Sequence, residues 1–373
     1  MTSHMPTDSE VALAALSSLS ALTPRQLRLA LAKADPCTLW ADLSSGSSMN
    51  LSAIGPGHQQ DVAREATALD VDKLRATLTQ LSIQVLATHS AGTPDHLRND
   101  ESRPPAIFLR GDRSLLTQRM VAIVGTRRAT AAGRATATEL AEQLSAAGII
   151  VVSGLALGID TAAHRGAMSQ GSTVAVVGCG LDRCYPTRHQ ELFDEMCEHH
   201  LVLSEWPPGI PPAPYRFPMR NRLIAALAEL LIVVESDSTG GSLITAREAL
   251  ERGREVMAVP GSPRVATSRG TNALIRDGAT PVTCVDDVIQ ALGITHVSAQ
   301  QTSPAAGLHE NSIEIVHLLK SEALTLGQIV DRLSLPIGET VIVMSELVQR
   351  KIITETNGWF ELAGSMLVSG GEL

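Results

Sequence analysis

Short apolar runs recur along the middle of this chain, and most are followed by a glycine-bearing turn and a stretch of helical pattern. The runs occupy residues 121–124, 149–152, 173–177, 201–204, 230–234, 255–259 and 282–284, and helices are expected at 133–147 and 161–170. Strands buried on both faces read as continuous apolar runs, and helices are the usual connections between parallel strands. The pattern therefore predicts an α/β fold, an extended Rossmann-like, doubly wound and mostly parallel sheet.

Residues 1–85 carry a helical pattern, which predicts a small N-terminal helical domain. Thr23 followed by Pro24 is typical of a helix start, and residues 61–81 have apolar side chains at the spacing of one amphipathic helix. The glycine-containing segment 54–57 resembles the turn of a helix-hairpin-helix (SAM/HhH-like) module, and an ordinary helix connection is the alternative. Two further strands are expected at 83–87 and 106–110.

The last part of the chain predicts a small module behind a polar linker. Helices are expected at 312–319, 326–333 and 339–350, followed by two strand segments around Asn357–Gly358. Three helices and a hairpin predict a winged helix. The predicted organisation is a helical domain at 1–85, a Rossmann-like domain at 86–293, a linker at 294–309, a winged helix at 310–365 and a tail at 366–373.

The composition favours a folded protein of the cytoplasm. A chain of 373 residues with 44% hydrophobic content can bury a sizeable core, and its first residues show no signal-peptide pattern. No apolar run reaches the roughly 18 residues of a membrane span, so we expect no membrane partner. The five cysteines are odd in number and form no C-x-x-C pair. We therefore expect neither a disulfide framework nor a zinc site. We also expect no other metal site and no cofactor.

The net charge of −9 argues at first against nucleic acid, but the charge is unevenly distributed. Residues 119–293 hold 16 Arg, no Lys and 18 acidic residues, whereas residues 294–373 net −5. Three groups of arginines lie beside glycine-bearing turns: Arg127, Arg128 and Arg134; Arg216, Arg220 and Arg222; Arg264, Arg269 and Arg276. The fold either joins these groups into a local positive face or leaves them as ordinary solvated arginines.

Ligands of doubly wound sheets bind beyond the carboxyl ends of the strands, where this sequence places several of its glycine turns. The turn at 239–242 lies between the apolar run 230–234 and a helical segment. Free backbone N–H groups and the helix dipole point the same way at such a turn, which makes it an anion site. A phosphate is the expected occupant, from either a small nucleotide or a nucleic-acid strand.

No familiar catalytic pattern accompanies this turn. The segment after 121–124 lacks the G-x-G-x-x-G of dinucleotide-binding proteins, and the region has no Gly-Lys-Ser or Gly-Lys-Thr. Asp160 and His164 lie one helical turn apart, and we interpret them as a helix cap and a packed or paired imidazole rather than as catalytic groups. Glu235 and Glu248 could contact a ribose or a loop amide. No acid–base pair assembles, so we expect no enzymatic activity.

Eight stretches of the sequence resemble the DNA-processing protein A family, also called DprA or Smf. They are 121–130, 152–164, 174–186 with Gly178-Cys179-Gly180-Leu181-Asp182 and Tyr185-Pro186, 204–207, 217–224, 241–246, 254–261 and 270–279. They cover roughly residues 107–290 in the family's order. The sequence departs from the family at Ala273, where many relatives have Lys or Arg, and at Thr93–Pro94, which replaces a Tyr-Pro pair.

The resemblance implies a protein of natural transformation and recombination that binds and protects single-stranded DNA, helps to load a RecA-type recombinase and forms a homodimer through the Rossmann-like domain. It implies DNA contacts from Gly125, Thr126, Arg127, Ser153, Gly154, Phe217, Arg220, Asn221, Gly240, Gly241, Ser242 and Thr245. In this interpretation the two glycine turns and Arg127 meet phosphates, and Arg220 and Asn221 hold a phosphate or a base edge. Phe217 either stacks on a base or is a core residue.

Aromatic residues make up only 2% of the chain. We therefore expect no stacking platform of the kind that OB-folds use, and binding that depends mainly on arginines and turn amides. Two other functions are compatible with the residues. One is a nucleotide-acting, phosphoribohydrolase-like enzyme, because Glu248 follows the glycine turn. The other is a duplex DNA-binding regulator that uses the winged helix, although the acidity of that module favours a protein-interaction or regulatory role.

Overall fold

The structure is a computed structural model, and it describes residues 4–45, 56–90, 92–294, 310–319, 322–350, 352–356 and 358–362. The chain forms two compact units, Met1–Leu292 and Gly293–Leu373. None of the helices in the described ranges combines the length and the apolar character needed to cross a membrane.

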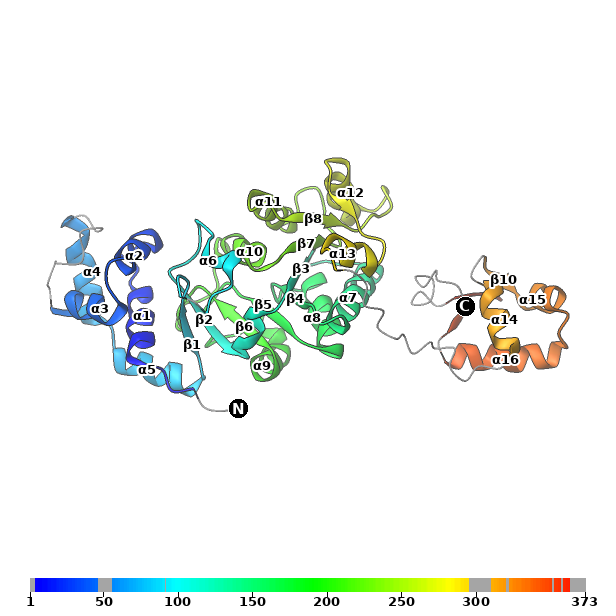
Figure 1. Ribbon diagram of the computed structural model, residues 1–373, viewed down its shortest axis with the longest axis horizontal. Coiled ribbons are helices and arrows are strands. Elements are labelled where there is room, and N and C mark those ends of the chain that lie inside the picture. Colours follow the sequence, from blue (N-terminus) through cyan, green and yellow to red (C-terminus); the bar gives the residue numbers. More distant parts are fainter. Residues whose placement is uncertain are drawn as a thin grey trace. The chain divides into compact units, whose positions relative to one another are not determined.

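A nine-stranded sheet forms the centre of the larger unit, with the strand order β1-β2-β6-β5-β4-β3-β7-β8-β9 (Figure 1). Its strands are β1 (Gln84–Ala87), β2 (Ala106–Gly111), β3 (Met120–Val124), β4 (Ile150–Ser153), β5 (Thr173–Val176), β6 (Leu201–Ser204), β7 (Leu230–Val233), β8 (Glu255–Ala258) and β9 (Thr280–Pro281). The strands from β6 to β9 pair in parallel, and β1 and β2 add an antiparallel edge. The predicted α/β fold with a mostly parallel sheet is confirmed.

Helices cover both faces of this sheet, as the continuous apolar strands require. In β5, Val174 and Val176 belong to the core beneath helix α10 (Arg216–Leu227), whereas Ala175 belongs to the core beneath helix α9 (Gln190–His199). Figure 1 shows α10 and α11 on one side and α8 and α9 on the other. The helices of this domain are α6 (Asp95–Arg98), α7 (Ala131–Ala146), α8 (Ile159–Gln170), α9 (Gln190–His199), α10 (Arg216–Leu227), α11 (Ser242–Glu251), α12 (Arg269–Arg276) and α13 (Val285–Ala291).

The N-terminal helices pack as part of the same unit. They are α1 (Asp8–Ser18), α2 (Pro24–Leu31), α3 (Pro36–Ser45), α4 (Pro56–Ala68) and α5 (Val71–Gln80). Thr23 and Gln26 form a capping box at the start of α2, which confirms the predicted helix start. Leu13 of α1 shares an apolar core with Phe108 of β2. The boundary at residue 85 therefore stays a prediction, because the two segments share a core.

Two predicted elements are wrong in detail. The single helix expected at 61–81 is two helices, because the Asp70 carboxylate accepts a hydrogen bond from the Lys73 amide and caps a new helix. The last strand is Thr280–Pro281 instead of 282–284, where Cys284 already precedes α13. Residues 54 and 55 of the predicted helix-hairpin-helix turn lie outside the described residues.

The smaller unit contains helices α14 (Glu310–Leu319), α15 (Leu326–Leu333) and α16 (Ile337–Gln349) and strands β10 (Leu324–Thr325), β11 (Ile353–Thr356) and β12 (Trp359–Leu362). The strands form a sheet of order β10-β12-β11. The three helices and the hairpin fall at their predicted places, and β10 is an addition to the prediction. Assignment as a winged helix stays a prediction, and most of the linker 294–309 and the tail 366–373 lie outside the described residues.

Candidate functional site

The sheet has a topological switch point between β3 and β7. These strands are parallel neighbours, and the chain leaves β3 toward β4 on one side and leaves β7 toward β8 on the other. Where successive connections diverge in this way, the loops at the carboxyl ends of the strands leave a crevice that binds ligands. The loops that follow Val124 and Val233 are therefore the expected position of a ligand site.

One anion position at this switch point is already filled by the protein itself. The Glu235 carboxylate accepts hydrogen bonds from the Thr130 amide at 2.9 Å and the Thr130 hydroxyl at 2.5 Å, at the start of α7. A side chain at Gly133 would overlap this carboxylate. The expectation that Glu235 contacts a loop amide is confirmed. A phosphate at the same helix N-terminus would face a negative charge, so the N-terminal amides of α7 are a poor phosphate site.

The main chain of the loop after β3 is also occupied. The Thr126 amide donates to the Glu235 carbonyl at 2.8 Å, and the Thr126 carbonyl accepts from the Ile159 amide at 3.3 Å. Gly125 is required here because a side chain would overlap Ile159. The Thr126 amide is therefore engaged within the fold, whereas the Arg127 side chain is exposed. Within this loop, the Arg127 guanidinium is the group that is available to a ligand.

Arg127 lies over an aromatic pair. Its guanidinium carbon is 5.2 Å from the centre of the Phe217 ring, and the Phe217 and Tyr185 rings stack with centres 5.2 Å apart and planes at 29°. Tyr185 is 41% exposed and Phe217 is half-buried. Phe217 thus lies in a surface cluster rather than in a core, and its stacking on a base stays a prediction. Offset aromatic rings and a guanidinium offer flat surfaces that suit a nucleobase.

A second group of aromatic residues lies just before α10. The Arg216 guanidinium carbon is 5.2 Å from the Tyr215 ring centre and 6.0 Å from the Trp206 ring centre, and Tyr215 is 59% exposed. Both tyrosines of the chain and Trp206 therefore lie in loops between β5 and α10, and Phe217 lies in the first turn of α10. The Tyr185–Phe217 stack shows that the fold brings some of these few rings together, and the expectation that they form no stacking platform of the OB-fold kind stays a prediction. The one available signal was that these aromatics follow consecutive predicted strands.

Helix α10 joins this cluster to the glycine turn. Phe217 and Asn221 are four residues apart and share a helix face, and the Asn221 amide group donates to the Gly241 carbonyl at 3.5 Å. The Gly240 amide is used within the turn, where it donates to the Asp237 carbonyl at 3.0 Å. The amides of Gly241 and Ser242 precede or begin the first turn of α11, where helix geometry supplies no intrahelical acceptor. These two amides remain suited to an anion.

Arg220 has a different position from the one expected. It is 4% exposed, and its guanidinium donates to the carbonyl of Val176 at 2.7 Å. Burial lowers the pKa of Arg220 to about 10, although the charge of Asp160 opposes that shift, and burial raises the pKa of Asp160. A side chain on Gly154 would overlap the guanidinium. Arg220 therefore holds the ends of β4 and β5 against α10, and we interpret it as a positioning residue.

The twelve predicted contact residues lie around the switch point but differ in accessibility. Five are buried, namely Ser153, Gly154, Arg220, Ser242 and Thr245; five are partly exposed, namely Gly125, Thr126, Phe217, Asn221 and Gly240; Arg127 and Gly241 are exposed. The Ser153 hydroxyl donates to the Ile123 carbonyl, and the Ser242 hydroxyl donates to the Ser236 hydroxyl. These hydroxyls stabilise the loops. Contact of the twelve residues with DNA stays a prediction.

Asp160 and His164 do not form a catalytic pair. The His164 ring accepts a hydrogen bond from the Leu155 amide through Nε2, so Nδ1 carries the proton and donates to the Thr173 hydroxyl at 2.8 Å. Burial lowers the pKa of His164 to about 3. The Asp160 carboxylate accepts from the Ala156 amide at 3.3 Å. The interpretation of His164 as a packed imidazole is confirmed. The interpretation of Asp160 as the helix cap is wrong, because Gly158 is the N-cap of α8 without a side-chain cap bond and Asp160 lies within the first turn.

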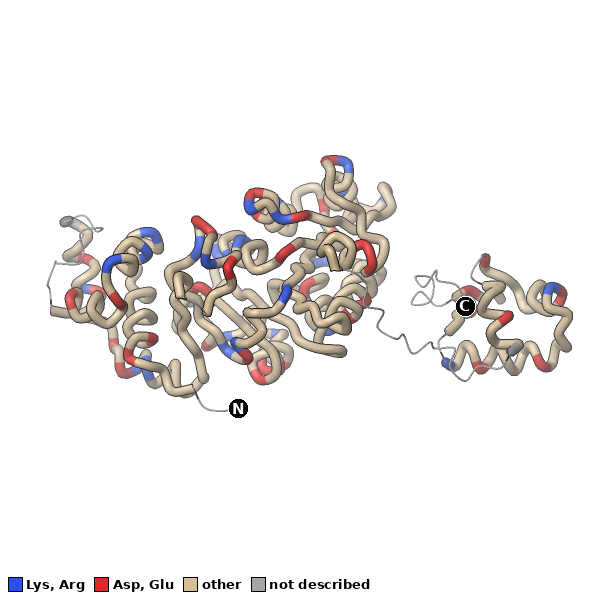
Figure 2. The backbone as a smooth tube through the Cα atoms, in the orientation of Figure 1, with Lys and Arg blue, Asp and Glu red and all other residues tan. Residues whose placement is uncertain are grey.

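Several other arginines are neutralised by carboxylates. Arg252 binds Asp100 and Glu248, each at 2.6 Å, and Arg222 binds Glu205, whose pKa burial raises to about 6. Arg127, Arg128, Arg134 and Arg165 form no ion pair within the described residues. Basic and acidic residues are interspersed along the tube in Figure 2. A local positive surface therefore depends on which arginines lack a carboxylate, not on the arginine count.

The described residues contain no group of three or more His, Cys, Asp or Glu side chains placed to hold a metal ion. Burial raises the pKa of the Cys179 and Cys184 thiols to about 11 and that of Cys197 to about 12. These three thiols are therefore poor nucleophiles near neutral pH.

The fold and the site define a doubly wound α/β protein whose strand ends carry unpaired arginines and exposed aromatic rings. The sequence model of the family described as DNA recombination-mediator protein A matches residues 84–293. The chain belongs to this family of DNA-processing proteins.

Individual relatives agree with this assignment. The DNA processing protein DprA of Bacillus subtilis is 38% identical over 234 residues, which are 62% of this chain and 78% of that protein. The crystal structure of DprA from Streptococcus pneumoniae superimposes with a TM-score of 0.65 at 33% identity, over 76% of this chain and 97% of that one. A structure that describes the single-stranded DNA binding mode of DprA from Helicobacter pylori gives a TM-score of 0.52 at 30% identity, over 57% and 96% of the two chains.

Proposed function

We propose that this protein binds single-stranded DNA across the carboxyl ends of β3, β5, β6 and β7. The observation that carries the proposal is the Arg127–Phe217–Tyr185 cluster, in which an unpaired guanidinium lies over stacked, partly exposed rings. An extended strand needs cations for its phosphates and flat surfaces for its unpaired bases. The related DprA of Helicobacter pylori is described as binding single-stranded DNA, which supports the same ligand here.

In this proposal each group has a separate task. Arg127 neutralises a backbone phosphate, and the amides of Gly241 and Ser242 bind another at the start of α11. Tyr185, Tyr215 and Phe217 stack on bases, which is sequence-tolerant because every base has a flat face. Arg220 and Asn221 act indirectly, since Arg220 holds the strand ends and Asn221 binds the Gly241 carbonyl.

The proposal extends to the partners of the bound strand. We propose that the protein protects single-stranded DNA and helps to load a RecA-type recombinase during DNA uptake, natural transformation and recombination in the cytoplasm. Membership of a family described as recombination mediators supports this role. We also propose a homodimer through the Rossmann-like domain. The exposed apolar side chains Ile244 and Leu250 on α11 are compatible with such an interface.

A nucleotide-hydrolysing function is the first alternative, and the environment of Glu248 argues against this function. Its carboxylate binds Arg252 at 2.6 Å, and the same arginine binds Asp100. A catalytic acid or base needs a free carboxyl group within reach of substrate. We therefore propose a non-enzymatic function. Release of a free base from a nucleoside monophosphate by the purified protein would contradict that part of the proposal.

Duplex recognition by the smaller unit is the second alternative. Arg332 of α15 binds Glu322 at 2.7 Å, and α16 carries Glu339 and Glu346 but no basic residue. If α16 entered a DNA groove, its carboxylates would be repelled by the phosphates. Ile337 and Ile342 of α16 are more than half exposed, so this unit is better suited to a protein partner.

Fluorescence anisotropy with labelled oligothymidylate and with a duplex of equal length tests the proposal. We expect single-strand binding to be the tighter of the two at two salt concentrations, with a dependence on salt that reflects phosphate neutralisation. Equal or tighter binding of the duplex would contradict the proposed function.

A further inference from the structure

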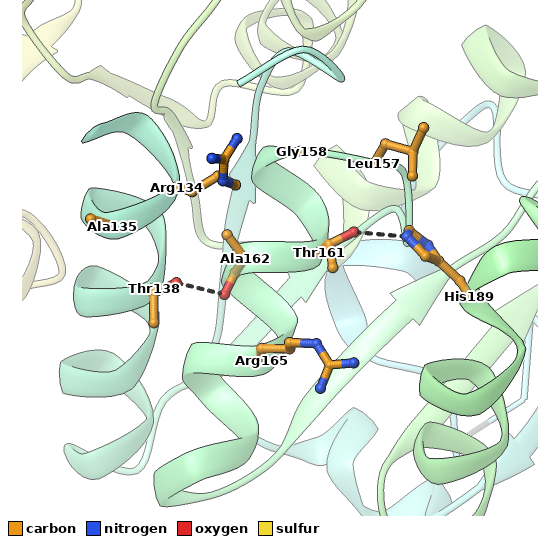
Figure 3. A pocket seen from close by; sticks show the side chains of 9 residues that line it. All are labelled: Arg134, Ala135, Thr138, Leu157, Gly158, Thr161, Ala162, Arg165 and His189. Atoms are coloured by element: carbon orange, nitrogen blue, oxygen red, sulfur yellow. Dashed lines mark hydrogen bonds between the residues drawn. The ribbon is translucent and has the colours of Figure 1, made fainter. Parts of the chain in front are cut away.

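A groove between α7 and α8 lies beside the proposed site and has no role in it so far. The two helices touch where a side chain on Gly166 would overlap the backbone of Thr138, and they leave an open space nearer their N-terminal ends. The cavity there has a volume of about 460 Å³. Its lining consists of Arg134, Ala135, Thr138, Leu157, Gly158, Thr161, Ala162, Arg165 and His189 (Figure 3).

The lining of this groove suits an anion. It contains two arginines and no carboxylate, and neither Arg134 nor Arg165 forms an ion pair with any described residue. Figure 3 shows these arginines on opposite sides of Ala162. Both side chains are exposed. The Arg134 guanidinium donates to the Ala129 carbonyl at 2.6 Å through Nη1, which leaves its other N–H groups for a ligand. The alanines and Gly158 leave the space between them open.

A hydrogen-bonded wall closes the side of the groove formed by His189. The His189 ring binds the Leu155 carbonyl through Nδ1 at 3.0 Å, and its Nε2 faces the Thr161 hydroxyl at 3.3 Å. That hydroxyl also donates to the Ala156 carbonyl at 2.6 Å. These hydrogen bonds hold His189 and Thr161 in place without a ligand. A cavity of this volume falls within the usual range of roughly 300–1,000 Å³ for small-ligand sites, which suits a single nucleotide unit.

The groove is continuous with the proposed binding surface. Gly158, which lines it, packs so closely on the loop after β3 that a side chain would overlap the backbone of Thr126 and Arg127. The groove therefore borders the loop that carries Arg127, whose guanidinium lies over Phe217. A strand that passes over Arg127 would meet the two arginines of the groove next to this loop.

We propose that the groove between α7 and α8 binds a phosphodiester of the same single strand whose neighbouring nucleotides lie on the Arg127–Phe217 surface. This inference rests on the proposed function, which it extends by one subsite. Arg134 and Arg165 hold the phosphate from two sides, and the Thr161 side of the groove contacts the sugar. The binding footprint is therefore longer than the surface formed by the loops alone.

Substitutions at Ala135 test the groove with a matched control. Ala135 is an exposed lining residue of α7, so Ala135→Glu places a carboxylate in the groove and Ala135→Gln places an uncharged side chain of the same size, both with high helix propensity. Binding is measured for the shortest oligothymidylate that the wild type binds and for a longer one. We expect Ala135→Glu to weaken binding of the longer strand about tenfold and Arg165→Ala about fivefold. Ala135→Gln should stay close to wild type.

All three variants should bind the shortest strand as the wild type does. Wild-type affinity of Ala135→Glu and Arg165→Ala for the longer strand would overturn the groove while leaving the proposed function intact. Equal losses in Ala135→Gln and Ala135→Glu would contradict a phosphate as the occupant. Equal weakening of binding to the short and the longer strand would contradict the proposal, because the groove should contact only nucleotides that the longer strand adds. Failure of the wild type to bind either strand would overturn the proposed function and the groove together.

Discussion

The arginines of the larger unit form two sets. Arg222 and Arg252, which we call the paired arginines, bind Glu205 and Asp100, and both also bind Ser102 in the segment before β2. Arg127, Arg134 and Arg165, the unpaired arginines, have no carboxylate partner among the described residues and lie at the strand-end site and the groove beside it. The same residue type therefore has two tasks in one domain.

The difference explains how a chain of net charge −9 can bind a polyanion. The paired arginines cancel acidic side chains and fix α10 and α11 to the segment that leads into β2. No carboxylate cancels the positive charges of the unpaired arginines, so these charges can attract an anionic ligand. No carboxylate lines the groove that two of them flank. Local charge, and not the sum over the chain, decides binding. Loss of a paired arginine should lower stability, and loss of an unpaired one should lower affinity.

The largest effect is expected at Arg220, which is buried and belongs to neither set. Arg220→Ala leaves the buried Asp160 without its nearby cation and removes the donor to the Val176 carbonyl. We expect a loss of about 3–5 kcal/mol in the free energy of unfolding, measured by urea denaturation. An exposed arginine such as Arg276 serves as the control, and its replacement by alanine should change stability little. Wild-type stability in Arg220→Ala would show that the residue is not a positioning residue.

A paired arginine should show a smaller effect of the same kind. Arg252→Ala leaves Asp100 largely buried without its partner, and we expect it to lower the free energy of unfolding by about 1–3 kcal/mol. The affinity for oligothymidylate should not change under conditions in which the variant is folded. Weakened binding with unchanged stability would contradict the distinction between paired and unpaired arginines.

The buried imidazole of His164 makes the free energy of unfolding depend on pH. Its folded-state pKa of about 3 lies below the ordinary value of 6.5, so its contribution is fully present above pH 6.5 and is lost as the pH falls from 6.5 to 3. Between pH 6.5 and 5 the expected loss is about 2 kcal/mol. Denaturation of the wild type and His164→Gln at both values isolates this term. Equal losses in the two proteins would contradict the assigned neutral imidazole.

The aromatic part of the site predicts a change in affinity that leaves stability intact. Tyr215 is 59% exposed, so Tyr215→Ala should weaken oligothymidylate binding by about 1–3 kcal/mol if one base stacks on its ring. Tyr215→Phe retains the flat ring and should bind as the wild type does. Equal affinities for Tyr215→Ala and Tyr215→Phe would remove Tyr215 from the site.

The sheet could be predicted from the sequence because its strands are apolar on both faces. The β3 to β8 runs and the glycine turns are predicted correctly, since a buried parallel strand leaves a local pattern. The break at Asp70 between α4 and α5 is not, because the apolar spacing continues across it. The N-terminal helices also share a core with β2, which the helical pattern of residues 1–85 alone does not indicate.

The site was harder to predict than the sheet because it depends on distant partners. The sequence groups Arg220 and Arg222 with Arg216, but only the fold buries Arg220 and brings Glu205 to Arg222. No pattern in the sequence places Tyr185 on Phe217, because the two residues are more than 30 positions apart. Which arginine remains free and which ring meets another are properties of tertiary structure.

The central claim is that unpaired arginines at the strand ends bind the phosphates of a single strand. The most direct measurement is the affinity for oligothymidylate as a function of salt, for the wild type, Arg127→Ala and Arg252→Ala. Arg127→Ala should bind about fivefold more weakly at low salt, and its slope of log affinity against log salt should be shallower by about 0.7, the value for one lost phosphate contact. Arg252→Ala should keep the wild-type slope. A wild-type affinity and slope in Arg127→Ala would contradict the account.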